Sequence, residues 1–181
     1  MKILFMSDIH GIVDNLSKLD KIIEEERIDK LVVLGDLYYT GFNHIDKKVD
    51  VFGVREFLSK YKNILTCMRG NCDSDVDIEK SPFPILDDVS LINVDDIDIY
   101  ITHGNRYRYQ KNDTFENGVL IYGHEHIPYI QKDTDMIYIN TGSVSLPRNE
   151  LGPSYTIYEN RKFTIYSLID NSVIDSVELL S

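Results

Sequence analysis

The stretch KILFMSDIHG, residues 2–11, joins a continuous apolar run to a polar turn that ends in glycine. The apolar part, residues 2–6, is typical of a fully buried β-strand, because such strands need only about four to eight apolar residues bounded by turn signals. Asp8 and His10 follow at once, and both side-chain types bind metals. A strand that ends in such residues predicts a ligand site at one edge of a sheet.

The chain that follows alternates helices with buried strands. Residues 15–26 carry leucine and isoleucine at helical spacing, and residues 30–34 have the composition of a second strand. A short helix near residues 53–61 and a strand at 63–67 come next. This order predicts a parallel sheet with helices packed on its faces.

The second half is richer in strands, several of which alternate between apolar and polar residues. Together with the parallel first half, they predict a single α/β domain over residues 1–181, with two mixed β-sheets face to face and helices outside. The predicted strands are residues 90–94, 97–102, 119–123, 136–140, 154–159, 162–168 and 172–179, with hairpin turns at 159–162 and 169–172.

Composition narrows the range of functions. Lys and Arg total 19 against 30 Asp and Glu, a formal charge of −11 that argues against a polymeric nucleic-acid partner. No apolar run approaches the ~20 residues of a membrane span, and SDIH (7–10) cuts the first run short before it could form a signal-peptide core. Cys67 and Cys72 do not make a disulfide framework, so we expect a reducing, cytoplasmic location.

Glycine and metal-capable side chains recur where the predicted strands end. The second strand ends in GD (35–36), and the third is followed by RGNCD (69–73). Later strands end in THG (102–104) and in GHEH (123–126). In sheet proteins, ligands bind just beyond the carboxyl ends of strands. The candidate site residues are Asp8, His10, Asp36, Asn71, Cys72, Asp73, His103, His124 and His126.

Each motif by itself also has a structural explanation. GD (35–36) and THG (102–104) are common turn sequences, and SDIHG (7–11) could be a helix-entry cap with an incidental histidine. In GHEH, residues i and i+2 of an extended chain point the same way, so His124 and His126 are expected to converge on one point.

The conjunction of these motifs favours a metal site. Four of the five histidines follow strands beside glycine, and His44 alone does not. Imidazole, carboxylate and amide donors together suit borderline divalent ions such as Mn, Fe, Zn, Co or Ni. The donors outnumber the ligands of a single tetrahedral ion, which fits two ions that share one bridging carboxylate.

Five motifs in this order resemble the signature of the calcineurin-like metallophosphoesterases. Chain length and the segment NTGSVSLPR (140–148) make the chain look most like the small YfcE-type phosphodiesterases of that family. The resemblance implies a four-layer αββα sandwich, the metallo-dependent phosphatase fold, in which residues 140–148 pack near the site. The matching motifs are DIH (8–10), GD (35–36), GNCD (70–73), TH (102–103) and GHEH (123–126).

The resemblance also implies a mechanism. Two divalent ions, manganese foremost, would hold a bridging hydroxide that attacks the phosphorus of a small phosphodiester in line. A phosphomonoesterase or nucleotidase with the same metals stays open, as does a protein-binding scaffold such as the retromer subunit that resembles this family. By resemblance, Asp8, His10 and His126 would bind one ion, Asn71, His103 and His124 the second, and Asp36 would bridge them.

Asn71, Cys72, Asp73 and His103 are the residues expected to assist catalysis. Larger family members usually carry histidine in place of Cys72, and a thiol with an ordinary pKa near ~8.5 is a weaker hydrogen-bond donor to a leaving group. Cys72 is therefore either a proton donor or a small tolerated residue, and Asp73 is expected to steady its loop.

Three further features carry open alternatives. Arg69 either contacts phosphate or forms a surface ion pair. NRYRYQKND (105–113) and LYYTGFNH (37–44) either border the substrate mouth or are ordinary solvated loops. We also expect self-association as a dimer or tetramer through sheet edges, and no membrane partner.

Overall fold

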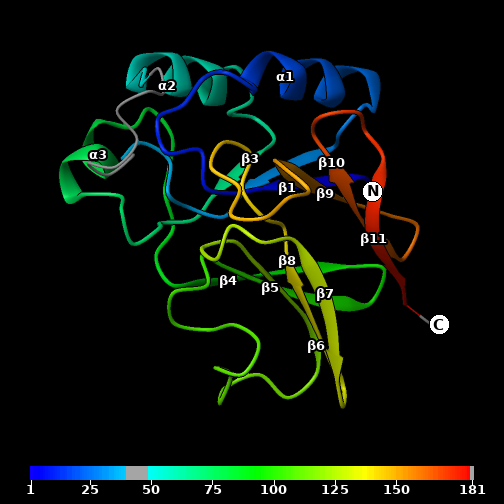
Figure 1. The fold of residues 1–181 in the computed structure, drawn as a ribbon. Helices are drawn as coiled ribbons and strands as arrows, with labels where there is room; N and C mark the ends of the chain where they lie inside the picture. Colours follow the sequence, from blue (N-terminus) through cyan, green and yellow to red (C-terminus); the bar gives the residue numbers. More distant parts are fainter. Residues whose placement is uncertain (40–48, 180–181) are drawn as a thin grey trace.

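The computed structural model describes residues 1–39 and 49–179. Two mixed β-sheets lie one above the other, and helices cover the upper one (Figure 1). The strands are β1 (Ile3–Met6), β2 (Lys30–Val33), β3 (Leu65–Cys67), β4 (Val89–Val94), β5 (Ile97–Thr102), β6 (Gly118–Tyr122), β7 (Tyr129–Asp133), β8 (Met136–Asn140), β9 (Ser154–Glu159), β10 (Lys162–Ser167) and β11 (Val173–Glu178). The helices are α1 (Leu16–Glu25), α2 (Val51–Lys60) and α3 (Asp75–Lys80).

Parallel strands form the part of each sheet that matters for the site. The six-stranded sheet has the order β11-β10-β9-β1-β2-β3, in which β1, β2 and β3 are parallel. The five-stranded sheet has the order β4-β5-β6-β8-β7, in which β5, β6 and β8 are parallel. The predicted strand–helix–strand opening and the mixed character of both sheets are confirmed. The carboxyl ends of parallel strands therefore meet at one edge of each sheet.

Alternate residues of β1 serve two different cores, because successive side chains of a strand point to opposite faces. Leu4 and Met6 pack with the apolar stripes of α1 and α2, whereas Ile3 and Phe5 pack with strands of the facing sheet. All four side chains are fully buried. The strand quoted first thus lies between the helix layer and the second sheet, which fixes the position of Asp8 just beyond its end.

The second outer layer of the expected αββα sandwich, on the five-stranded sheet, is formed by a loop in place of a helix. In the described part of the chain, α1 and α2 cover the outer face of the six-stranded sheet (Figure 1). The outer face of the five-stranded sheet carries the segment 105–117, whose Tyr109 ring packs at a tilt against Tyr138 and whose Phe115 ring packs at a tilt against Tyr100. This segment alternates aromatic with polar residues and lacks a helical stripe, so it forms an aromatic loop.

Two elements were not expected from sequence. Helix α3 buries no residue, so it has no apolar stripe to detect, and a capping box between Ser74 and Asp77 fixes its start. Strand β7 is mostly exposed and pairs only with β8 at the sheet edge. Among the described residues, none of the helices has the length and apolarity needed to cross a membrane.

Candidate metal centre

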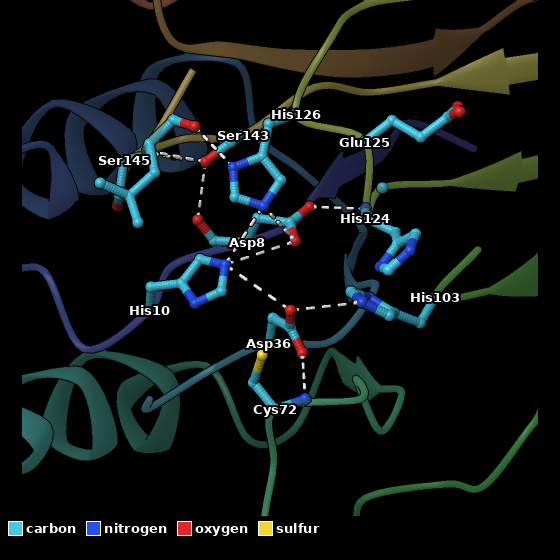
Figure 2. Close-up of polar contacts among 12 residues, drawn as sticks. Asp8, His10, Asp36, Cys72, His103, His124, Glu125, His126, Ser143 and Ser145 are labelled. Carbon is cyan, nitrogen blue, oxygen red and sulfur yellow. Dashed lines mark hydrogen bonds and ion pairs between the residues drawn. The ribbon is translucent and has the colours of Figure 1, made fainter. Parts of the chain in front are cut away.

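Side chains from five strand ends come together at the shared edge of the two sheets (Figure 2). Asp8 and His10 follow β1, and Asp36 follows β2. Residues 71–73 follow β3, His103 directly follows β5, and the turn 123–126 follows β6. The prediction that distant segments meet at one place therefore agrees with the geometry.

Asp8 lies at the centre of the first group. Its carboxylate is fully buried, and Oδ1 lies 3.2 Å from Nε2 of His126 and 3.7 Å from Nε2 of His10. The two Nε2 atoms are 3.3 Å apart. Within the described residues, Asp8 Oδ1 accepts no hydrogen bond. A buried carboxylate oxygen left in this state beside two imidazole nitrogens fits a bound cation, because buried charged oxygens are otherwise paired.

Three imidazole rings are held in the same way, with Nδ1 against a backbone carbonyl. Such a contact places a proton on Nδ1, so that the neutral ring has the lone pair of Nε2 available, which is the arrangement of metal-binding histidine. The pairs are His10 with Tyr39 O, His103 with Leu34 O at 2.8 Å, and His126 with Leu146 O.

Asp36 lies between two groups of imidazoles. Its Oδ2 is 3.6 Å from Nε2 of His10 and 3.4 Å from Nε2 of His103. Its Oδ1 accepts a hydrogen bond of 2.8 Å from the backbone N–H of Cys72. His103 Nε2 in turn lies 3.1 Å from Oδ1 of the exposed Asn71. This central position is the one a bridging ligand needs.

His124 and His126 do not converge on one point as an extended chain would allow, and they lie beside different histidines, as the family resemblance implies. The His126 ring lies 5.1 Å from the His10 ring, whereas the His124 ring lies 5.1 Å from the His103 ring, both measured between centroids. The physical reason is the backbone: both residues have positive φ angles, 67° and 61°, so the segment is a tight turn and not an extended strand. The two rings consequently face different neighbours.

Five of the candidate ligands share an unusual backbone conformation. Asp8, His10, Asp36, His124 and His126 all have φ between 53° and 67°, the left-handed region that non-glycine residues rarely adopt. Each such residue costs about 1–3 kcal/mol and persists only where the surrounding structure enforces it. Clustered strain of this kind is typical of functional sites.

Two glycines permit the close approach of the loops. A Cβ atom on Gly70 would overlap the backbone nitrogen and Oδ1 of Asp36. A Cβ atom on Gly123 would overlap Ser7 Oγ and Asp8 Oδ2. These positions explain why glycine accompanies the metal-capable residues in the sequence.

Burial and neighbouring charges shift the pKa values of the carboxylates and imidazoles in the site. Burial works against ionisation of Asp8 and of Asp36, but the adjacent imidazoles outweigh it and lower both carboxyl pKa values. Burial alone would lower the pKa of His103, yet the Asp36 and Asp8 carboxylates raise it to about 9. The pKa of His124 is lowered by burial and by the nearby His103.

Cys72 and Asp73 occupy different surroundings. The Cys72 thiol is half-buried, and burial together with the Asp36 carboxylate raises its pKa to about 12, so it is protonated at neutral pH. Asp73 is buried, and its carboxylate accepts hydrogen bonds from the backbone N–H groups of Asp36, Leu37 and Gly70. Burial outweighs these bonds and raises the pKa of Asp73 to about 6. Asp73 therefore holds together the two loops that carry Asp36 and Asn71.

The segment 140–148 packs against the site, as predicted. Ser143 Oγ donates to the backbone carbonyl of Asp8 and accepts from the backbone N–H groups of Ser145 and Leu146. This hydroxyl fixes the turn whose Leu146 carbonyl orients His126. The carbonyl partners of the imidazoles were not anticipated, because any residue type can supply a backbone carbonyl.

Arg69, the two cysteines and the segment 37–44 are the remaining features singled out in the sequence. Arg69 forms ion pairs with Asp75 and Asp87 at 2.7 and 3.7 Å, which agrees with the ion-pair alternative. Cys67 and Cys72 are free thiols. His44 and the part of the predicted wall from residue 40 onwards lie outside the described residues.

Known proteins share this sequence pattern and fold. Residues 1–162 match the calcineurin-like phosphoesterase superfamily domain. Phosphodiesterase YfcE of Escherichia coli (strain K12) is 30% identical over 181 residues, which cover 99% of this chain and 98% of that protein. The solved structure of YfcE, a phosphoesterase from E. coli, superposes with a TM-score of 0.92 at 30% identity and covers 98% of each chain.

More distant proteins share the sequence pattern or the fold. Phosphodiesterase MJ0936 of Methanocaldococcus jannaschii is 29% identical over 153 residues, 78% of this chain and 83% of that protein. Vps29 of Entamoeba histolytica, solved in complex with zinc, has the same fold, with a TM-score of 0.61 at 20% identity over 98% of each chain.

Family and geometry point to the same chemistry. The family implies divalent metal ions, and the Asp8 oxygen without a hydrogen bond, the Nε2 atoms directed at the carboxylates and the central Asp36 carboxylate form a donor set that suits them. The chain belongs to the calcineurin-like phosphoesterase superfamily and is a phosphoric ester hydrolase.

Proposed function

We propose that this chain is a phosphodiesterase that hydrolyses small phosphodiesters with two divalent ions, manganese foremost. The observation that carries the proposal is the shared state of the buried His10, His103 and His126 rings. Each has Nδ1 on a backbone carbonyl and directs Nε2 towards the Asp8 or Asp36 carboxylate. Histidines that only fill a core have no need of this common arrangement.

The donors divide into two groups that support two ions. The first group is gathered around Asp8 Oδ1, and Asp36 faces both groups with Oδ2. In this proposal Asp8, His10 and His126 hold one ion, Asn71, His103 and His124 hold the other, and Asp36 bridges them.

The protein supplies positions and charges, while the ions supply the reactive chemistry. When bound, two divalent ions neutralise phosphate oxygens and lower the pKa of water towards about 7, so that hydroxide is available as the nucleophile. The protein side chains nearby are unsuited to that role. Burial and the adjacent Asp36 carboxylate disfavour the Cys72 thiolate, and the Ser143 hydroxyl is engaged by Asp8 O and two backbone N–H groups. A water-derived nucleophile is therefore favoured over a covalent intermediate.

A cavity beside the site supports a small substrate. It measures about 470 Å³ and is lined by Arg69, Asn71 and Asn105 together with two aspartates. This volume is within the range of about 300–1,000 Å³ for small-molecule sites. The exposed Asp87 and Asp88 carboxylates also line it, and they form ion pairs with Arg69 and Arg106 respectively.

The test compares two chromogenic substrates after metal removal and reloading. Protein stripped with a chelator is loaded with Mn²⁺ and assayed with bis-p-nitrophenyl phosphate and with p-nitrophenyl phosphate. We expect hydrolysis to require the metal and to favour the diester. Faster hydrolysis of the monoester would establish the phosphomonoesterase alternative, and loss of both metal binding and hydrolysis would favour the protein-binding scaffold.

A further inference from the structure

We propose that Arg108 and Glu125 form a positioning pair for His124, and that this pair sets the affinity of the second metal position. The inference rests on the proposed two-ion function and adds residues that lie outside the ligand set. It starts from a difference among the four candidate histidines. His10, His103 and His126 each have a carbonyl partner for Nδ1, whereas no ring nitrogen of His124 has a hydrogen-bond partner among the described residues.

The position of the His124 ring therefore depends on the turn that carries it. That turn is strained, with φ of 67° at His124, and the ring is only half-buried. The His124 backbone N–H donates to Asp8 Oδ2 at 2.9 Å, which fixes one side of the residue. The other side is the peptide bond to Glu125.

Glu125 is held by several donors and points away from the imidazoles (Figure 2). Its Oε2 accepts from the hydroxyl of Tyr129 at 2.7 Å and from the side-chain amide of Asn140 at 3.1 Å. Its Oε1 lies 3.5 Å from Nε of Arg108. The same Asn140 amide also donates to the carbonyl of Gly123 at 2.8 Å, at the start of the turn. Glu125 thus anchors the strained turn and does not face the metal site.

Arg108 connects this anchor to the segment after His103. Its Nη1 donates to the carbonyls of Gly104 and Asn105 at 3.0 and 3.3 Å, while Nε faces Glu125. One guanidinium therefore joins the residues that follow His103 to the residue that follows His124. Its planar fork makes this possible, because a lysine amine offers only a point charge.

A second contact ties the same loop to the turn. The backbone N–H of Tyr109 donates to the hydroxyl of the buried Tyr122, which lies 2.7 Å from the Tyr129 hydroxyl that donates to Glu125. The aromatic loop is thereby connected to Glu125 through both Arg108 and the two tyrosines. The pair is partly buried, with side-chain exposures of 28% and 33%, so solvent screening weakens it only in part.

Breaking the Arg108–Glu125 pair should weaken metal binding at the second position only. His10 and His126 keep their carbonyl partners when the pair is broken, so the first position should retain its geometry. The second position would lose the fixed placement of His124. Removal of such an outer partner typically costs about 10–100-fold in metal affinity.

Calorimetric titration of the chelator-stripped full chain with Mn²⁺ tests the proposal. We expect two binding events in the wild type. In Arg108→Gln and in Glu125→Gln, one event should weaken about 10–100-fold, while the other keeps its affinity. Arg106→Gln is the matched control, because Arg106 lies on the same loop but pairs with Asp88 at 2.8 Å.

A double-mutant cycle identifies the affected ligand. His124→Ala should weaken the same event without abolishing it, and adding Glu125→Gln to it should cause no further loss of affinity. Urea unfolding of each variant reports any general loss of stability separately. If the wild type binds fewer than two ions, the two-ion function fails. If the wild type binds two and the Arg108 and Glu125 variants bind both as tightly, or lose both equally, the positioning role is refuted.

Discussion

At the scale of single residues, the site depends on a buried carboxylate between two groups of imidazoles. Asp36 is only 2% exposed and stays ionised because His103 and a backbone N–H outweigh the effect of burial. An ionised group in that position attracts cations to both sides of itself. An amide in this position could keep the hydrogen bond from Cys72 N–H but would lack the negative charge.

Asp36→Asn isolates that charge. Asparagine keeps an oxygen that can accept from Cys72 N–H, so the domain should fold. We expect Mn²⁺-dependent hydrolysis of bis-p-nitrophenyl phosphate to fall by more than about 100-fold, since even outer partners of metal ligands cost about 10–100-fold. Steady-state kinetics and circular dichroism measure the two effects, and unchanged turnover in a folded variant would refute the bridging role.

Protonation of His103 makes metal affinity depend on pH. Its pKa is raised to about 9, and that of His10 is raised as well, because adjacent carboxylates outweigh burial. A ligating imidazole must be neutral, so protons compete with the metal below that pH. The apparent Mn²⁺ affinity should therefore rise between pH 7 and 8.5, by about tenfold per pH unit for each proton released. Calorimetry in buffers of different ionisation enthalpy checks the released protons, and a flat profile would contradict the assignment.

Asp73 stabilises the loops that carry candidate ligands without being a candidate ligand itself, and this role can be tested. Its two carboxylate oxygens accept three backbone N–H bonds, whereas an asparagine side chain has one oxygen. Asp73→Asn should leave at least one buried N–H unpaired and lower the free energy of unfolding by about 1–3 kcal/mol. Urea denaturation measures this, with Asp87→Asn as the exposed control, expected to stay within about 0.5 kcal/mol. Equal stability of both variants would show that the loop does not need Asp73.

At the scale of elements, the site is a meeting of strand ends that only glycine allows to approach. The loop after β3 passes so close to the loop after β2 that Gly70 has no room for a side chain beside Asp36. The clash involves backbone atoms, which cannot rotate away as a flexible side chain can. Loop position and ligand position are thus coupled.

Gly70→Ala should separate these two loops. We expect a loss of metal affinity of at least about tenfold, as for other changes that displace the surroundings of a ligand, together with reduced stability. Calorimetric Mn²⁺ titration and thermal unfolding measure both. An alanine variant with wild-type affinity would mean that the loops have slack that the structure does not show.

Elements with a buried face were predictable from sequence, and those without one were not. The stripe of Leu16, Leu19, Ile22 and Ile23 identifies α1 because all four pack on the sheet. Strand β7 and helix α3 have few or no buried residues, so no apolar period marks them. The left-handed backbone of the GHEH turn was not predictable for another reason. Residues with φ near +60° cannot be recognised from a sequence pattern that also fits an extended strand.

At the scale of the whole molecule, the order of the motifs predicted the site, while its supporting contacts came from the fold. Nine polar residues were placed at strand ends, and the parallel strands bring those ends to one edge. The Leu34 and Leu146 carbonyls can come from any residue type, and the sequence does not show which carboxylate Arg108 will pair with. Such contacts follow from topology, so they become visible only in three dimensions.

The net charge of −11 predicts how salt affects the reaction. Two divalent ions would offset only part of it, so an anionic substrate still meets a repulsive field at long range. The ratio kcat/KM for an anionic diester should rise as NaCl is increased from low concentration to about 0.15 M, where the Debye length is about 8 Å. Steady-state kinetics over that range test this, and a fall with salt would point to a basic approach path.

The left-handed backbone shared by five candidate ligands has one more consequence. Because the surrounding fold enforces these conformations, the backbone itself determines where the rings and carboxylates point. An emptied molecule would keep its shape and accept a fresh ion without refolding. Since a site of imidazole and carboxylate donors accepts several borderline metals, and their availability helps to decide which one binds, the occupant would then reflect what the growth medium supplies, and batches grown in different media would carry different elements.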